Sequence, residues 1–295
     1  MFGTIKFGKV LGIDLIVHGT FWLLPLYVFF SGAMSGDVSE AAFSVAVVLA
    51  AFACVAMHEY GHALAARYYG VGTRDITLYP LGGVARLERM PSRPVQEIVI
   101  ALAGPAVNLV IAAGLLAAVV AGNVAVPGGF SLSHLEVAER FVVALLVSNV
   151  ILLVFNLLPA FPMDGGRVLR AALSLGMGRV RATRAAVAVG TVMAGLFLLV
   201  GAGLLPNPLT GDRETSFSLM LVAVVVYMLG QAELAAARVQ AARTRWRDWS
   251  GGYETARGSH ETSAGDPRTE WVWDPVRRVW SLWHNGVLVR EVPPA

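Results

Sequence analysis

Long apolar runs restrict the fold of this chain more than any other feature. Residues 41–57, AAFSVAVVLAAFACVAM, contain no charged side chain. A helix that spans a bilayer needs about 20 mainly apolar residues, and soluble domains carry roughly a quarter charged residues. Only 15% of this chain is charged, and its mean hydropathy is +0.63. The sequence therefore predicts an all-α polytopic membrane protein.

Six stretches are apolar enough to be predicted as transmembrane helices. The second one contains residues 41–57 and ends in a polar motif discussed below; the others cover approximately residues 15–33, 95–122, 141–158, 185–205 and 218–237. Residues 70–94 are too polar, and too rich in Gly and Pro, to cross the bilayer. Apolar positions there flank Gly82 and Gly83, which predicts a short β-hairpin or re-entrant segment. Residues 1–14 alternate in polarity and predict short strands or an interfacial segment.

Lysine and arginine are distributed very unevenly over the predicted loops. Sixteen of them fall on the side that holds both termini, whereas the opposite loops hold only Arg140 and Arg213. Because cytoplasmic loops are enriched in these residues, both termini are predicted to be cytoplasmic, in a multi-pass protein of the cell membrane. Among the sixteen are the five arginines of residues 167–184, which we interpret as a surface helix and loop. The net charge of +3 is thereby explained without a nucleic-acid partner.

A polar motif of the form H-E-x-x-H interrupts the second apolar run. His58 and His62 are four residues apart, so on a helix both imidazoles project from one face. This arrangement suits two ligands of a tetrahedral zinc, and Glu59 is placed to take a proton from water at the same site. Ionisable residues at membrane depth are usually functional. The chain's one cysteine, Cys54, excludes a cysteine-based zinc cluster and is interpreted as helix packing.

A candidate third ligand follows the fourth apolar stretch, in the sequence NLLPAFPMDGG from Asn156 to Gly166. Its prolines and glycines predict a broken helix, which at this depth must line a protein-enclosed or watery cavity. Asp164 would complete a His-His-Asp zinc site; the alternative is that it caps the next helix. Asn156 is a candidate to bind the substrate backbone or the oxyanion, with capping of the broken helix as its alternative.

These paired motifs resemble those of the site-2 protease family of intramembrane zinc metalloproteases. The resemblance covers about residues 1–237 and extends to Gly82-Gly83, to AGPAVN at 103–108 and to the opening G-x-D-x-x-V-H at 12–18. It implies that His58, His62 and Asp164 bind one zinc ion per chain and that Glu59 is the catalytic carboxylate. It also implies a single-span membrane protein as substrate, cleaved in or near its transmembrane segment in regulated intramembrane proteolysis.

The chain departs from relatives that carry regulatory modules. It has no PDZ-sized insert, and its tail is too short for paired CBS domains, so a six-span form without either is expected. The start of the sequence has no signal-peptide pattern. We divide the chain into a protease domain at 1–237, a polar linker at 238–269 and a small tail at 270–295. Turn signals and four tryptophans predict a β meander there.

Two questions are left open by the sequence. Gly82 and Gly83 would let an unwound substrate pair with the segment from Ile76 to Leu87, but that segment could equally be a structural hairpin. The whole chain could also be a metal-ion transporter that uses the same His/Asp site, since broken helices and charged midplane sites occur in carriers. Against a transporter, H-E-x-x-H supplies a general base that a carrier does not need. Membrane lipid is an expected partner, and a homo-oligomer is left open.

Overall fold

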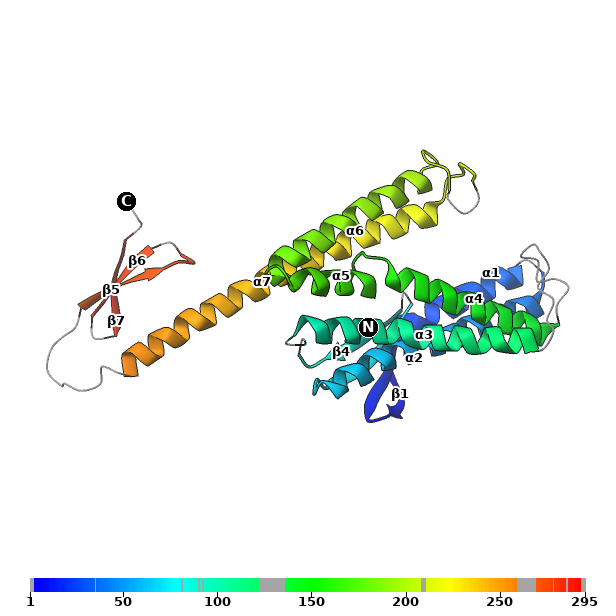
Figure 1. Ribbon diagram of the computed structural model, residues 1–295, viewed down its shortest axis with the longest axis horizontal. Coiled ribbons are helices and arrows are strands. Elements are labelled where there is room, and N and C mark those ends of the chain that lie inside the picture. Colours follow the sequence, from blue (N-terminus) through cyan, green and yellow to red (C-terminus); the bar gives the residue numbers. More distant parts are fainter. Residues whose placement is uncertain are drawn as a thin grey trace. The chain divides into compact units, whose positions relative to one another are not determined.

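The computed structural model describes residues 3–34, 36–80, 82–89, 91, 93–121, 136–207, 211–258, 269–277, 279–284 and 286–292 (Figure 1). The chain divides into two compact units, residues 1–239 and residues 240–295. The first unit holds a helical bundle and a four-stranded sheet, and the second holds a three-stranded sheet.

Five described helices are long and apolar enough to cross a membrane: α2 (Val38–Tyr68), α3 (Pro94–Ala121), α4 (Val137–Leu157), α6 (Arg179–Gly201) and the part of α7 (Phe217–Gly258) that extends from Phe217 to Arg243. The prediction of a mainly helical membrane protein is thereby confirmed. The remaining predicted stretch, residues 15–33, is a shorter apolar helix, made of the 3-10 turn η1 (Gly19–Trp22) and α1 (Leu23–Met34).

The predicted start of the first membrane helix is wrong, because residues 15–18 belong to a strand. Leu11 and Gly12 both have positive φ angles, 51° and 84°, and reverse the chain between β1 (Thr4–Val10) and β2 (Ile13–His18). β2 then pairs on both sides, and buries Ile13 and Val17. A short apolar run such as this one can form a half-buried strand as readily as part of a membrane helix, and the turn at Leu11 and Gly12 decides between them.

The four strands of the first sheet follow the order β1-β2-β3-β4, where β3 is Thr73–Tyr79 and β4 is Gly82–Leu87. β2 and β3 are parallel, with α1 and α2 forming the crossover between them, and the other two pairs are antiparallel. One face of the sheet packs on α2, where Val17 and Leu78 contact Ala56. β4 lies at an edge of the sheet and also contacts α2, where Ala85 packs against the cluster that contains Ala63.

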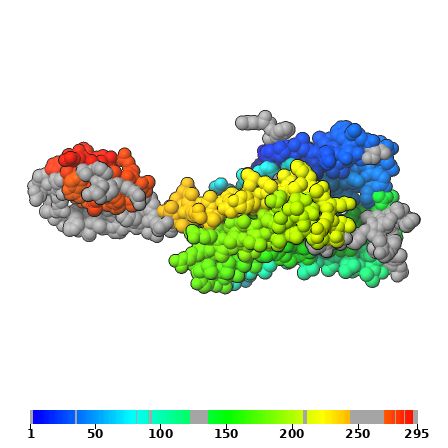
Figure 2. Space-filling view, turned by 90° about the horizontal axis from the view of Figure 1, so that it is seen from above, coloured from blue at the N-terminus to red at the C-terminus, as the bar shows by residue number. Residues whose placement is uncertain are grey.

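α3 has the helices that form the site as its neighbours. It contacts α2, α4 and also α5 (Asp164–Ser174), a short helix that follows α4 after a break at residues 158–163. α6 and α7 lie side by side in both views (Figures 1 and 2), with Val187 against Leu234 and Ala194 against Val226. The break predicted after the fourth apolar stretch is therefore the place where the chain turns from α4 into α5.

The second unit contains the antiparallel strands β5 (Thr269–Asp274), β6 (Val279–His284) and β7 (Val287–Val292), in that order in the sheet. This arrangement is the predicted meander. Trp273 and Trp280 face each other across β5 and β6, with ring centroids 5.3 Å apart. Residues 240–258, in the predicted linker, continue α7 as a helix.

Candidate metal centre

His58 and His62 lie on consecutive turns of α2 and project from the same face. Both are buried, at 5% and 4% exposure, and their Nε2 atoms are 3.0 Å apart. A helix of 31 residues holds this spacing because the two positions are separated by just over one turn. The motif lies well inside α2 rather than at its end, so its imidazoles sit within the bundle.

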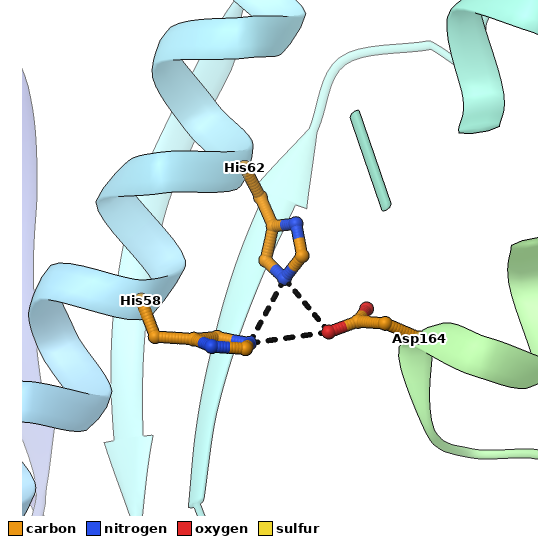
Figure 3. A group of neighbouring side chains, drawn as sticks. All are labelled: His58, His62 and Asp164. Carbon is orange, nitrogen blue, oxygen red and sulfur yellow. Dashed lines mark hydrogen bonds and ion pairs between the residues drawn. The ribbon is translucent and has the colours of Figure 1, made fainter. Parts of the chain in front are cut away.

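Asp164, the first residue of α5, brings the third side chain to the same point. Its Oδ2 atom is 3.1 Å from Nε2 of His58 and 3.1 Å from Nε2 of His62, and its side chain is also buried (Figure 3). The break after α4 lets α5 begin next to the face of α2 that carries the histidines, and so brings Asp164 to them. These three residues are the group of metal-ligating side chains found among the described residues.

The other nitrogen of each imidazole has a partner that fixes its tautomer. Nδ1 of His58 lies 2.8 Å from Oδ1 of Asn108, and Nδ1 of His62 lies 2.7 Å from the carbonyl oxygen of Ile100. Both partners accept hydrogen bonds, so each Nδ1 carries a proton and donates it. Both Nε2 atoms therefore present their lone pairs towards the carboxylate of Asp164.

The charge of Asp164 has to be balanced inside the protein. Burial opposes ionisation, but the imidazoles of His58 and His62, which donate to this carboxyl when Nε2 is protonated, and the nearby charge of Arg167 hold its pKa well below its usual range. Arg167 Nη1 lies 3.6 Å from Asp164 Oδ1. Asp164 is therefore a carboxylate at neutral pH, and either an added proton on the imidazoles or a metal cation must face its Oδ2.

The three ligand atoms fit a zinc ion by their chemistry and by their spacing. Two imidazole nitrogens and one carboxylate oxygen form a common zinc donor set, and zinc-to-ligand bonds of about 2.0–2.1 Å put tetrahedral ligands about 3.3 Å apart. The 3.0–3.1 Å separations of the ligand atoms are close to that value. The hydrogen bonds to Asn108 and Ile100 match the outer contacts that orient histidine ligands in metal sites. His58, His62 and Asp164 can therefore hold one zinc ion.

α3 comes very close to the site at Gly104. A Cβ atom added at this position would overlap Nε2 of both His62 and His58, since nothing but the glycine backbone separates α3 from the histidines. The absence of a side chain at Gly104 thus leaves the space in which the three ligand atoms meet.

Glu59 is held beside β4. Its Oε2 atom accepts a hydrogen bond from the Ala85 amide at 3.0 Å, and the side chain is half-buried. Gly83 lies against the same carboxylate, where an added Cβ would be 2.6 Å from Glu59 Cγ. The predicted catalytic carboxylate, which follows the first histidine in the sequence, is therefore held in place by its contacts with the sheet.

The remaining predicted site residues lie in two places. Gly82 and Gly83 begin β4 and pair with Tyr79 and Leu78. Asn156 is in the last turn of α4, where its Nδ2 donates to the Leu152 carbonyl at 3.0 Å. This contact lies within α4 and does not cap the end of the helix, so both the role of Asn156 in catalysis and its capping alternative stay predictions.

Several residues that shape the site were not assigned a role from the sequence. Asn108, Ile100 and Gly104 all come from α3; Gly104 and Asn108 belong to the AGPAVN segment that resembles the site-2 protease family, but the sequence assigns none of the three a part in the metal site. One signal was available, because an asparagine inside an apolar span is costly unless it is paired. Asn108 is fully buried, and its Nδ2 has no partner among the described residues, while its Oδ1 faces His58.

Replacing Asn108 with alanine is expected to weaken zinc binding by about 10–100-fold, the usual effect of removing a partner of a histidine ligand. The change leaves Nδ1–H of His58 buried without an acceptor, so the ring is no longer held. A competitive chelator titration measures the affinity. Asn149→Ala is the matched control, since Asn149 is equally buried but contacts Cys54 and Leu145. Equal affinities in wild type and Asn108→Ala would refute this role.

Known proteins share sequence with much of this chain. The model of peptidase family M50 matches residues 46–200. A zinc metalloprotease of Methanocaldococcus jannaschii is 32% identical over 237 residues, which cover 80% of this chain and 62% of that protein. Stage IV sporulation protein FB of Bacillus subtilis is 29% identical over 156 residues, covering 52% of this chain and 45% of that protein. The chain thus spans less than two thirds of either curated relative.

A solved structure resembles the fold described above. The site-2 protease from Methanocaldococcus jannaschii superimposes with a TM-score of 0.53 and 29% sequence identity, over 79% of this chain and 95% of that one. Residues 46–200 of the family match contain all three candidate metal ligands together with Glu59.

Proposed function

The chain belongs to peptidase family M50, and we propose that it is a zinc-dependent endopeptidase that hydrolyses peptide bonds in or near transmembrane segments of other membrane proteins. One observation carries the proposal. His58, His62 and Asp164 meet at one buried point inside an apolar bundle, with a carboxylate, Glu59, on the neighbouring position of the same helix. A metal carrier would need the three ligands but would have no use for a fixed carboxylate beside them.

Each residue has a distinct part in the proposed reaction. A bound zinc ion supplies Lewis acidity, which makes water a stronger nucleophile near neutral pH and polarises the scissile carbonyl. Glu59 accepts the proton of the attacking water and then donates it to the leaving amine. The Ala85 amide holds one carboxylate oxygen of Glu59, which limits the positions the side chain can take. Asn156 is retained as the candidate contact to the substrate backbone or oxyanion.

The proposed topology has six spans, with both termini in the cytoplasm. Five helices have the length to cross, and the apolar helix Gly19–Met34 is proposed as the sixth. Its length of about 24 Å is short of a hydrocarbon core of about 30 Å. Packing of α1 against α2 supports it within the bundle. The uneven distribution of lysine and arginine supports an orientation in which the metal site lies towards the cytoplasmic side.

We propose that an unwound segment of a single-span substrate pairs with the edge of β4. Ala85 donates its amide hydrogen to Glu59 and not to β3, so it faces the outer edge of the sheet. Amides two residues apart point the same way along a strand, and Gly83 therefore faces that edge as well. A peptide paired there would run along Glu59, with Gly82 and Gly83 allowing close backbone approach.

Replacing Gly83 with alanine is expected to reduce cleavage by about 100-fold, because a shift of about 1 Å in a catalytic group has effects of that size. The new Cβ would lie 2.6 Å from Glu59 Cγ and must displace that side chain. Zinc content should stay at the wild-type level. Gly176→Ala is the control, since an added Cβ there meets no atom within 4 Å. Wild-type cleavage by Gly83→Ala would show that Glu59 is not held in its working position by β4.

The proposed function is tested with the full chain reconstituted in liposomes together with a tagged single-span protein whose span is weakened by Gly and Pro. The expected result is cleavage that stops on removal of zinc by a chelator and returns when zinc is added back. Entry of zinc into the same liposomes, persisting in Glu59→Gln, would instead establish the rival function of metal-ion transport.

A further inference from the structure

Four charged side chains form a cluster where α3, α5, α6 and α7 meet: Glu97, Arg170, Arg179 and Glu233. Arg170 is at its centre, with only 2% of its surface exposed. Its guanidinium donates to Glu97 through Nε, at 2.9 Å, and through Nη2, and donates to Glu233 through Nη1. Arg179 adds a contact to Glu97 at 3.4 Å. The prediction that Arg170 lies on a surface helix is therefore wrong.

Arg170 needs a charged partner because its guanidinium is buried and has lost its contact with water. An isolated charge inside a protein is very unfavourable, and pairing with hydrogen-bonded carboxylates is the usual solution. A buried pair of this kind is weak evidence for stability, since apolar side chains could fill the same space. The elements that the pair joins are more informative than its energy.

The pair of Arg170 and Glu97 joins α5, which carries the ligand Asp164, to α3, which holds the two histidine ligands through hydrogen bonds. Arg170 follows Asp164 by six residues on α5, so a rigid helix connects the guanidinium to the third ligand. Glu97 precedes Ile100 by three residues on α3, and the Ile100 carbonyl accepts the hydrogen bond from His62. A continuous path therefore leads from one ligand to another through this ion pair.

Arg170 also contacts the segment that leads into α5. Its guanidinium carbon lies 5.1 Å from the centre of the Phe161 ring, and Phe161 is 3% exposed. Stacking of arginine on an aromatic ring fixes the plane of the guanidinium. The same side chain thus holds α3 on one side and the broken segment before Asp164 on the other.

We infer that Arg170 and Glu97 are positioning residues of the metal site, which set α5 against α3 and so place Oδ2 of Asp164 at the two histidines. The inference rests on the proposed zinc binding. Glu233 contacts the same guanidinium but comes from α7, which supplies neither a ligand nor a hydrogen bond to one among the described residues, and its side chain is 34% exposed. The two carboxylates should therefore differ in their effect on the metal.

The test compares Glu97→Gln, Arg170→Lys and Glu233→Gln with the wild type, all as full chains in detergent. Zinc affinity is measured by chelator competition, and ligand geometry by the visible absorption of the cobalt-substituted protein. Glu97→Gln and Arg170→Lys are expected to weaken zinc binding by about 10–100-fold and to change the cobalt spectrum. Glu233→Gln is the matched control, the same substitution at the other carboxylate, and should keep wild-type values for both.

The single cysteine supplies a measure of folding that does not depend on the metal. Cys54 is buried at 3% exposure one turn before His58, so its protection from a maleimide reports the packing of α2. Protection should be kept in all variants. Wild-type zinc affinity and a wild-type cobalt spectrum in Glu97→Gln would overturn the inference. An equal loss of zinc affinity in Glu233→Gln, or exposure of Cys54 in both Glu97→Gln and Arg170→Lys, would also overturn it. A wild-type chain that binds no zinc would instead refute the proposed function.

Discussion

Replacing Glu59 with glutamine is expected to reduce substrate cleavage by about 10²–10⁴-fold, the range that general acid–base catalysis contributes. Glutamine has the same shape and can still accept the hydrogen bond from the Ala85 amide, so the side chain keeps its place. It cannot take up a proton from water near neutral pH. Because Glu59 is not among the three ligands, one zinc ion per chain should remain bound.

The measurement combines single-turnover cleavage of a tagged single-span substrate with metal analysis of the same sample. Glu88→Gln is a suitable control, because Glu88 is exposed just beyond β4 and carries the same change of charge. Cleavage at the wild-type rate by Glu59→Gln would exclude Glu59 as the proton acceptor. Loss of zinc from this variant would mean that the carboxylate serves as a ligand.

Replacing Gly104 with alanine is expected to weaken zinc binding by about 100-fold or more, at the upper end of the effects seen when a metal site is disturbed, and to abolish cleavage with it. The added methyl group would occupy the space in which the Nε2 atoms of both histidines meet Asp164. Alanine favours a helix by about 1 kcal/mol over glycine, so α3 itself should not be weakened. The damage is expected at the metal and not in the fold.

Gly114→Ala provides the matched control for this substitution. Gly114 lies on the same helix, and a Cβ added there meets nothing within 4 Å. Zinc per chain after dialysis, together with helix content by circular dichroism, separates the two variants. Stoichiometric zinc and full cleavage in Gly104→Ala would contradict the position of the metal between α2 and α3.

The sequence was sufficient to predict the family, the membrane helices and the group of residues that meet at the candidate metal centre. The spacing of His58 and His62 is a local property of one helix, and Asp164 follows a break that Pro and Gly make visible. The comparisons confirm the resemblance to site-2 proteases. Each of these predictions rests on a pattern that lies within a short stretch of the chain.

Features that depend on packing between distant segments could not be predicted. Asn108 and Gly104 matter because α3 crosses α2 at the histidines. They lie in the AGPAVN segment that resembles the family, but that segment does not indicate which residues of α2 it contacts. Arg170 was interpreted as a surface cation because arginines cluster there, and only its contact with Glu97, 73 residues away, shows why it is buried. The parallel pairing of β2 with β3 likewise joins segments separated by two helices.

The central claim is that His58, His62 and Asp164 hold one catalytic zinc ion, and zinc X-ray absorption spectroscopy of the purified chain tests it most directly. The expected spectrum of the wild type shows two imidazole ligands and further oxygen ligands at about 2.0–2.1 Å, with no sulfur at about 2.3 Å. Asp164→Ala should lose most of its zinc, because one of three protein ligands is gone. A sulfur ligand in the wild type, or an unchanged zinc spectrum and content in Asp164→Ala, would contradict the claim.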